Sequence, residues 1–204
     1  MQGAEPPDGG FGGCPPEFPN RFGEGCGAGS AATMMTDKDV IEVTGRLEEA
    51  GLNFWLDGGW GVDALLGEQT RDHSDLDIVV ELLRIDKVIA TLATLGFAIN
   101  LDDRPTRLVV ADARDRRIDL HPITLNADGN GVQAGAGPNG GDAIYPAAGL
   151  AGEGMVAGHR VACLTAELQL MHHRGYEPKE NDRHDVRLLC ERFGLALPHG
   201  YAAP

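Results

Sequence analysis

Residues 75–80, which read DLDIVV, constrain the fold more than any other segment of the chain. The run of β-branched apolar residues predicts a buried strand. Because residues i and i+2 of a strand point to the same face, Asp75 and Asp77 converge while Leu76 and Ile78 enter the core. Two carboxylates on one face repel each other unless they are solvated at the mouth of the strand or share a cation. A hard, oxygen-preferring ion such as Mg²⁺ fits such a pair.

A pair of glycines follows the preceding strand. Residues 53–56 (NFWL) predict a short buried strand, and residues 60–66 predict a short helix. Gly58-Gly59 between them lets the backbone approach a phosphate closely and directs helix N–H groups at it. The segment lacks both the G-x-G-x-x-G and the G-K-[ST] pattern, so it is neither a dinucleotide-binding nor a Walker loop, and a plain turn is the alternative.

A third acid, Asp119, lies on another predicted strand. Residues 107–111 and 117–121 are apolar runs joined by a polar turn, which predicts an antiparallel hairpin. Three acids from two neighbouring strands, beside a glycine-rich turn, are suited to metal-assisted phosphoryl or nucleotidyl transfer.

The other patterned segments alternate helices with strands. Thr36 and Asp39 form a predicted capping box for a helix that ends at Gly51. The remaining predictions are helices over 85–92, 165–174 and 186–193, a hairpin over 155–163, and a long loop or flap over 126–154. This mixture indicates an α/β or α+β protein in which helices flank a mixed sheet.

Composition bounds the organisation and the partners. Residues 1–34 are rich in Gly and Pro and predict a disordered tail; 35–197 predict one domain, with C-terminal helices from about 165, and 198–204 a short tail. The formal charge of −14 would repel a phosphate backbone, so no nucleic-acid partner is expected. With no long apolar run and no signal-peptide pattern, we expect a cytoplasmic protein without a membrane partner. The cysteines form no C-x-x-C pair and are expected to be free thiols: Cys14, Cys26, Cys163 and Cys190.

Several sequence blocks resemble one enzyme superfamily. Gly58-Gly59, Asp75-Leu76-Asp77 and Asp119 follow the order seen in the nucleotidyltransferase superfamily that includes DNA polymerase beta. Over residues 38–195 the chain more closely resembles the small lincosamide nucleotidyltransferases and, more distantly, the aminoglycoside 2''-nucleotidyltransferases. The blocks that carry this resemblance are WLDGGWGVDALLG at 55–67, RDHSDLDI at 71–78, DLHPITLN at 119–126, ELQLMHHRGY at 167–176 and NDRHD at 181–185.

The resemblance implies a nucleotidyltransferase fold and a reaction. A nucleoside monophosphate would move from an NTP, with ATP the expected one, to a hydroxyl of a small antibiotic-like molecule, and pyrophosphate would leave. Asp75 and Asp77 would hold Mg²⁺. Asp119 would ligate a metal on the nucleophile side or take the hydroxyl proton as general base.

The residue that binds a phosphate in much of the superfamily is replaced in this chain. Trp60 stands where much of the superfamily has a phosphate-binding Ser, so we expect these contacts from the backbone of Gly58-Gly59 and from Arg71 and His73. The alternatives are a surface ion pair for Arg71 and a structural hydrogen bond for His73.

The C-terminal part supplies candidates for acceptor binding. We expect His173, Tyr176 and Glu177 to contact the acceptor, with Tyr145 a further candidate. The negative charge suits an acceptor that carries a protonated amine, as lincosamides and aminoglycosides do.

Other interpretations stay open. The same chemistry fits an aminoglycoside 2''-nucleotidyltransferase, and the same fold fits an antitoxin or regulatory module that acts on a protein. His172-His173 with His184-Asp185 also resembles a His-Asp metal phosphohydrolase, but no upstream helix supplies the further His that such a site needs. The sequence also leaves a homodimer open.

Overall fold

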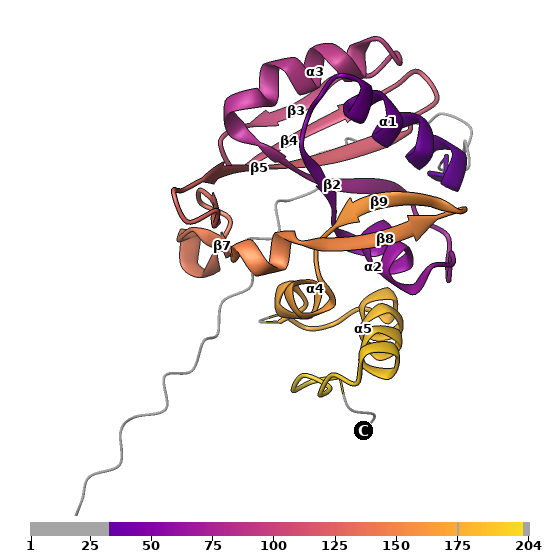
Figure 1. The fold of residues 1–204 in the computed structure, drawn as a ribbon, viewed down its shortest axis with the longest axis vertical. Helices are drawn as coiled ribbons and strands as arrows, with labels where there is room; N and C mark the ends of the chain where they lie inside the picture. The colour runs from indigo at the N-terminus through magenta and orange to yellow at the C-terminus, as the bar shows by residue number, and fades with distance from the viewer. Residues whose placement is uncertain (1–32, 175, 202–204) are drawn as a thin grey trace, which may run out of the picture.

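A nine-stranded mixed sheet is the centre of the computed structural model, which describes residues 33–174 and 176–201. Seven strands follow one path in the order β3-β4-β5-β2-β1-β9-β8, and β6 and β7 extend from β5 (Figure 1). The strands are β1 (Phe54–Leu56), β2 (Asp75–Glu81), β3 (Ala98–Asp103), β4 (Arg107–Ala111), β5 (Arg117–Leu125), β6 (Gly131–Gln133), β7 (Ala143–Tyr145), β8 (Gly152–Val156) and β9 (His159–Cys163). The predicted mixed sheet is confirmed.

The pairing of β2 with β5 brings the predicted acids together. These two strands run parallel, with Asp77 opposite Asp119. On its other side β2 pairs antiparallel with β1, where Leu56 lies opposite Ile78. Because β1 leads directly into the glycine pair, the chain places the start of a helix beside the acidic end of β2.

Helices lie on both sides of the sheet, as Figure 1 shows: α1 and α3 pack together on one side, and α2, α4 and α5 pack together on the other. They are α1 (Asp37–Glu49), α2 (Gly58–Leu66), α3 (Ile85–Ala93), α4 (Ala166–His172) and α5 (Glu180–Phe193), with short 3₁₀ turns at Leu82–Arg84, Pro138–Gly140 and Ala147–Leu150. The predicted capping box at Thr36 and Asp39 is confirmed, and Gly67 ends α2 in the left-handed conformation.

The core explains why β2 reads as an apolar run. Leu76, Ile78 and Val80 are fully buried in the main cluster with residues of α1 and α3, whereas Val79 is buried in a second cluster with Ile123. The strand is therefore covered on both faces, as expected for a central strand with a parallel neighbour.

Two predictions about local structure differ from what is observed, and one strand was not predicted. The loop predicted over 126–154 contains β6, β7, a 3₁₀ turn and the start of β8. Gly131 in this segment serves close packing, since a Cβ there would meet Ile123 Cδ1 at 2.6 Å. Strand β3 gave no sequence signal because every residue in it is exposed at a sheet edge. The spacing of Val186, Leu189, Cys190 and Phe193 predicts one apolar helix face, but Phe193 is 42% exposed.

The ends of the described chain are packed. Met35 is buried and its N–H donates to the carbonyl of His73, while most of the predicted disordered tail, residues 1–32, lies outside the described residues. Tyr201, in the segment predicted as a C-terminal tail, is buried against Leu170 and Val186. Cys163 and Cys190 are buried free thiols; Cys14 and Cys26 lie outside the described residues. No described helix is long and apolar enough to span a bilayer.

Candidate active site

The glycine pair is required by two different neighbours. Gly58 has φ +55°, and a Cβ there would overlap the Asp77 carboxylate. A Cβ at Gly59 would overlap the side chains of His73 and Arg71. Asp57 caps α2 through the Gly58 N–H, at 2.8 Å. The start of α2 is thus pressed directly against the acidic end of β2.

Two of the three predicted acids converge with a histidine. The ligand atoms of Asp77, Asp119 and His121 all lie within 4.8 Å of one another. His121 follows Asp119 by two residues on β5, so strand geometry places both on one face. Asp75 lies at the exposed mouth of β2, outside this group. We call Asp75, Asp77, Asp119 and His121 the acidic site.

The donor set of the acidic site fits a divalent cation. Carboxylate oxygens from two neighbouring strands are the ligands that Mg²⁺ and Mn²⁺ accept, and an imidazole nitrogen is better suited to Mn²⁺ and softer metals. Although Asp75 is exposed, partial desolvation of its carboxyl by the surrounding chain and the charge of Asp77 raise its pKa above its usual range. A cation bound there would relieve this repulsion.

His121 is held between acids and an amide. Its Nε2 lies 3.2 Å from Asp77 Oδ1. Burial lowers the pKa of this imidazole, but the hydrogen bond to Asp77 and the charges of Asp119, Asp77 and Asp57 raise it to about 9. Gln133 Nε2 lies 3.3 Å from Nδ1, a contact that is favourable only when Nδ1 carries no proton. We conclude that the raised pKa of His121 outweighs the Gln133 contact, because the contacts with the carboxylates are charged and the Gln133 contact is long.

A hydrogen-bonded chain connects the acidic site to β7. The Tyr145 hydroxyl donates to Gln133 Oε1 at 2.6 Å, and Gln133 Nε2 donates to the carbonyl of Thr106 at 2.7 Å. This second bond fixes the orientation of the Gln133 amide toward His121. The segment 126–154, predicted as a long loop or flap, therefore supplies two buried residues, Gln133 and Tyr145, that position the site.

Arg107 covers Asp119 from the neighbouring strand β4. Its Nε donates to both oxygens of Asp119, at 2.9 and 2.7 Å, and a terminal nitrogen also contacts Oδ2. Asp119 is buried, whereas 41% of the Arg107 side chain is exposed. No local sequence signal marks this pair, because it depends on the register between β4 and β5.

Arg71 and His73, the predicted phosphate contacts, are both engaged by buried carboxylates. Arg71 makes a two-pronged ion pair with Asp185 of α5, at 2.9 and 2.6 Å. His73 Nε2 lies 2.5 Å from Asp63 of α2, and its ring packs against Trp60 at 4.7 Å between centroids. The structure therefore contains the alternatives foreseen for both side chains: an ion pair for Arg71, although a partly buried one, and a structural contact for His73. An acid on a short helix such as α2 is expected to pack rather than to bind a metal, and the contact of Asp63 with His73 agrees with that role.

The predicted acceptor residues belong to the C-terminal helical part. His173 is buried, and its Nδ1 lies 2.8 Å from the carbonyl of Gln169. Tyr176 is half-buried, and burial raises the pKa of its hydroxyl. Glu177 is exposed, with one oxygen 3.3 Å from Arg183.

The neighbouring His172, which the sequence did not single out as a substrate contact, faces the start of α2. Its Nδ1 lies 3.6 Å from Asp57 Oδ2, and its ring meets the Tyr145 ring edge-on at 4.9 Å. Burial raises the pKa of Asp57, but the hydrogen bond and charge of His172, the charge of His121 and the Gly58 N–H lower it to about 2. Asp57 is therefore a permanent anion beside the acidic site.

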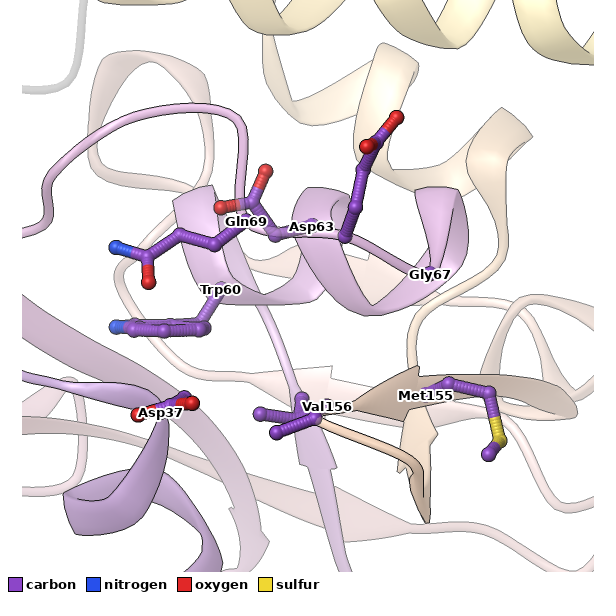
Figure 2. Close-up of a pocket in the computed structure, with 9 residues that line it drawn as sticks. Asp37, Trp60, Asp63, Gly67, Gln69, Met155 and Val156 are labelled. Atoms are coloured by element: carbon purple, nitrogen blue, oxygen red, sulfur yellow. The ribbon is translucent and has the colours of Figure 1, made fainter.

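Trp60 points to a different space. A cavity of about 120 Å³ lies beside α2 and includes none of the three predicted acids. Figure 2 shows its lining residues, which include Asp37, Trp60, Asp63, Gly67, Gln69, Met155 and Val156. Trp60 is 2% exposed, and its Nε1 lacks a hydrogen-bond partner within the described part of the chain. The Trp that replaces the expected Ser thus packs α2 against β8.

Comparisons with known proteins agree with this geometry. Residues 39–189 match the family described as Aminoglycoside-2''-adenylyltransferase. A lincosamide resistance protein of Staphylococcus haemolyticus is 34% identical over 155 residues, which are 76% of this chain and 94% of that protein. A 2''-aminoglycoside nucleotidyltransferase of Klebsiella pneumoniae is 28% identical over 61% of this chain and 64% of its own length.

Solved structures show the same fold. The lincosamide antibiotic adenylyltransferase LnuA, crystallised with lincomycin, has 34% identity, covers 77% of this chain and 98% of its own, and superposes with a TM-score of 0.68. ANT(2'')-Ia in complex with adenylyl-2''-tobramycin has 20% identity, covers 78% of this chain and 89% of its own, and gives a TM-score of 0.61. The second likeness supports the fold alone.

Proposed function

The chain belongs to the aminoglycoside-2''-adenylyltransferase family, and from this premise we propose that it transfers AMP from ATP to a hydroxyl of a lincosamide-type antibiotic and releases pyrophosphate. The observation that carries this proposal is the placement of Asp77 opposite Asp119 on parallel strands, against the start of α2. The lincosamide acceptor is favoured because the relative with 34% identity is matched over 94% of its length.

The acidic site is proposed to hold Mg²⁺ through Asp75, Asp77 and Asp119. Bound there, the ion would neutralise charge on the triphosphate and on the leaving pyrophosphate. The raised pKa of Asp75 and the converging oxygens of Asp77 and Asp119 support this assignment.

The chain's own residues would perform the transfer as follows. The acceptor hydroxyl oxygen attacks the α-phosphorus, the bond from that phosphorus to the bridging oxygen of pyrophosphate breaks, and Asp119 accepts the hydroxyl proton. The start of α2, next to Asp77, presents the positive end of its dipole and the partly exposed backbone of Gly58-Gly59 to the phosphates.

The acceptor is proposed to approach from the C-terminal side. His173, Tyr176 and Glu177 remain the proposed acceptor contacts, and the exposed carboxylate of Glu177 suits a protonated amine. His172 lies beside Asp57 and contacts the ring of Tyr145, and the two side chains extend the same side of the site. Because the reaction consumes ATP, we place it in the cytoplasm.

An aminoglycoside acceptor is the second candidate. The description of the matched family favours it, and ANT(2'')-Ia shares the fold. Both acceptors are cations, so the formal charge of −14 does not distinguish them.

Mass spectrometry tests the proposal. The full-length chain is incubated with Mg²⁺, each NTP in turn, and lincomycin, clindamycin, tobramycin or kanamycin; Asp77→Asn is the matched control. We expect an AMP adduct on lincomycin and clindamycin, made from ATP by the wild type alone. Adducts confined to the aminoglycosides would establish the second candidate, and the absence of any adduct would contradict both.

A further inference from the structure

Arg107 is a cation at the acidic site that the resemblance does not assign. It extends from the first residue of β4, and its guanidinium reaches Asp119 on β5, where Val109 is the paired residue. The hydrogen bond to Asp119 raises the pKa of Arg107, and the charges of Asp119, Asp77 and Asp75 add to this effect. Its charge is therefore directed at three of the four members of the acidic site.

The other expected phosphate cations are committed to the scaffold. Arg71 is paired with Asp185, whose side chain is 3% exposed, and His73 with Asp63, whose side chain is 2% exposed. Turning Arg71 away from Asp185 would leave a buried carboxylate without this cation, which is costly, and moving His73 would break its contact with the buried Asp63. Arg107 is more accessible, because 41% of its side chain is exposed, compared with 21% for Arg71.

Arg107 also occupies the oxygens that a bound cation would need. Its Nε donates to Oδ1 and Oδ2 of Asp119 together, yet Asp119 belongs to the group whose ligand atoms converge within 4.8 Å. Two cations that share one carboxylate repel each other. A divalent ion at Asp77 and Asp119 therefore requires the guanidinium to give up at least part of its contact.

We propose that Arg107 is the phosphate-contacting side chain of this site: it neutralises Asp119 in the metal-free protein and turns to the nucleotide phosphates when a divalent cation takes its place. The inference rests on the proposed function. A guanidinium suits this task because its planar fork donates two parallel hydrogen bonds to phosphate oxygens, which an ammonium group does not. Its new position stabilises charge on the phosphate under attack.

Binding of Mn²⁺ alone, measured on the full-length protein by electron paramagnetic resonance without nucleotide, separates this role from a structural one. Removing a competing cation tightens metal binding, so Arg107→Gln should bind Mn²⁺ on the order of fivefold more tightly than the wild type. Arg104→Gln, which removes an exposed arginine paired with Asp102 on β3, is the matched control and should leave Mn²⁺ affinity unchanged.

The same variant should lose function with nucleotide. In Arg107→Gln we expect the KM for ATP to rise and kcat to fall by about 100-fold, with partial recovery in Arg107→Lys, which keeps the charge but not the fork. If Arg107→Gln does not fold, Arg107→Lys replaces it in both measurements. Because this variant keeps the charge, we expect its Mn²⁺ affinity to be near that of the wild type. Unchanged or weaker Mn²⁺ binding in a folded Arg107→Gln, or an unchanged KM for ATP, would overturn the role of Arg107. If the wild type bound no Mn²⁺, or bound it equally well after Asp77→Asn, the proposed function itself would fail.

Discussion

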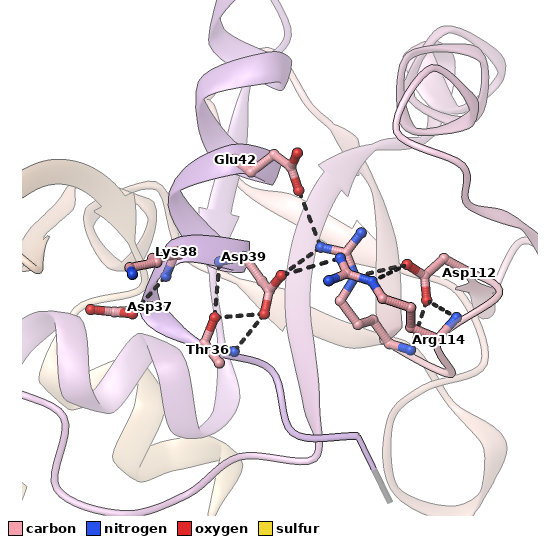
Figure 3. A network of polar contacts seen from close by, with 8 residues as sticks. Thr36, Asp37, Lys38, Asp39, Glu42, Asp112 and Arg114 are labelled. Atoms are coloured by element: carbon pink, nitrogen blue, oxygen red, sulfur yellow. Dashed lines mark hydrogen bonds and ion pairs between the residues drawn. The ribbon is translucent and has the colours of Figure 1, made fainter.

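Two clusters of carboxylates lie along the same β4–β5 hairpin: the pKa of Asp75 in one is raised, and the pKa values of Asp39 and Asp112 in the other are lowered. At the turn end, Asp39, Glu42 and Asp112 converge from α1 and the hairpin (Figure 3). Arg116 donates to all three, at 2.6, 3.1 and 2.8 Å, and its side chain is 4% exposed. We call these four residues the Arg116 cluster. The acidic site, in contrast, places three aspartates around Arg107 and His121.

The pKa shifts separate the two clusters. Burial raises the pKa of Asp112, but hydrogen bonds from Arg116 outweigh burial and lower it below its usual range, and Asp39 is shifted in the same direction. In the acidic site, partial desolvation and a like charge raise the pKa of Asp75. In the Arg116 cluster a buried guanidinium compensates the carboxylates, whereas in the acidic site Asp75 keeps a raised pKa although Arg107 and His121 lie nearby.

The comparison predicts its largest effect for Asp77→Asn. Asp77 contacts His121 and lies under Gly58, so its loss should remove the cation site. We expect the transfer rate to fall by about 1,000-fold or more while the fold is kept. Turnover with Mg²⁺ measures this directly, and a variant with near wild-type turnover would contradict the metal-site assignment.

The Arg116 cluster should respond in the opposite way. Arg116→Gln leaves Asp39 and Asp112 to the longer contacts of the exposed Arg114, at 3.5 and 3.4 Å, and we expect the free energy of unfolding to fall by about 3 kcal/mol. The kcat should not change at temperatures where the variant is folded. Urea denaturation gives the first quantity, and Arg160→Gln, which breaks an exposed pair with Glu153, is the control expected to have little effect. Equal losses of unfolding free energy in Arg116→Gln and Arg160→Gln would mean that the buried Arg116 cluster contributes no more to stability than an exposed ion pair.

Asp119→Asn tests whether Asp119 acts as the general base or binds the nucleotide. Loss of the proposed general base should lower kcat by about 100-fold, with little change in ATP affinity. Steady-state kinetics with varied ATP measures both. A variant that loses ATP binding but keeps kcat at saturating ATP would place Asp119 in the nucleotide site instead.

The smallest effect concerns pH. The pKa of His121 is raised from 6.5 to about 9, so its charged form stabilises the metal-free protein fully below pH 6.5, and this contribution is lost as pH rises through 9. In the Arg116 cluster the pKa values are lowered, so that contribution is lost as pH falls. Urea denaturation between pH 6.5 and 9 in EDTA should show a smaller decline in stability for His121→Asn. An identical decline would mean that His121 is not charged at neutral pH.

Local signals predicted much of the fold and part of the site. The apolar run after Asp75 and the cap at Thr36 act within a few residues, and both are confirmed. His121 could have been found by the same rule that paired Asp75 with Asp77, because it follows Asp119 by two residues on one strand.

The rest depends on contacts that no short segment encodes. Arg107 meets Asp119 through strand register, and Arg71 meets Asp185 across 114 positions of sequence. The strands β6 and β7 have three residues each, too few for a periodic pattern, and their glycines imitate a loop.

The most direct test of the central claim compares Asp75→Asn with Asp112→Asn by thermal melting in EDTA and then in Mg²⁺. A carboxyl whose pKa is raised in the folded state costs stability when charged, so Asp75→Asn should melt above the wild type in EDTA and gain less from Mg²⁺. Asp112→Asn should melt below the wild type in both. If Asp75→Asn instead melted below the wild type in EDTA, the acidic site would be part of the structural framework, like the Arg116 cluster, and the account would be contradicted.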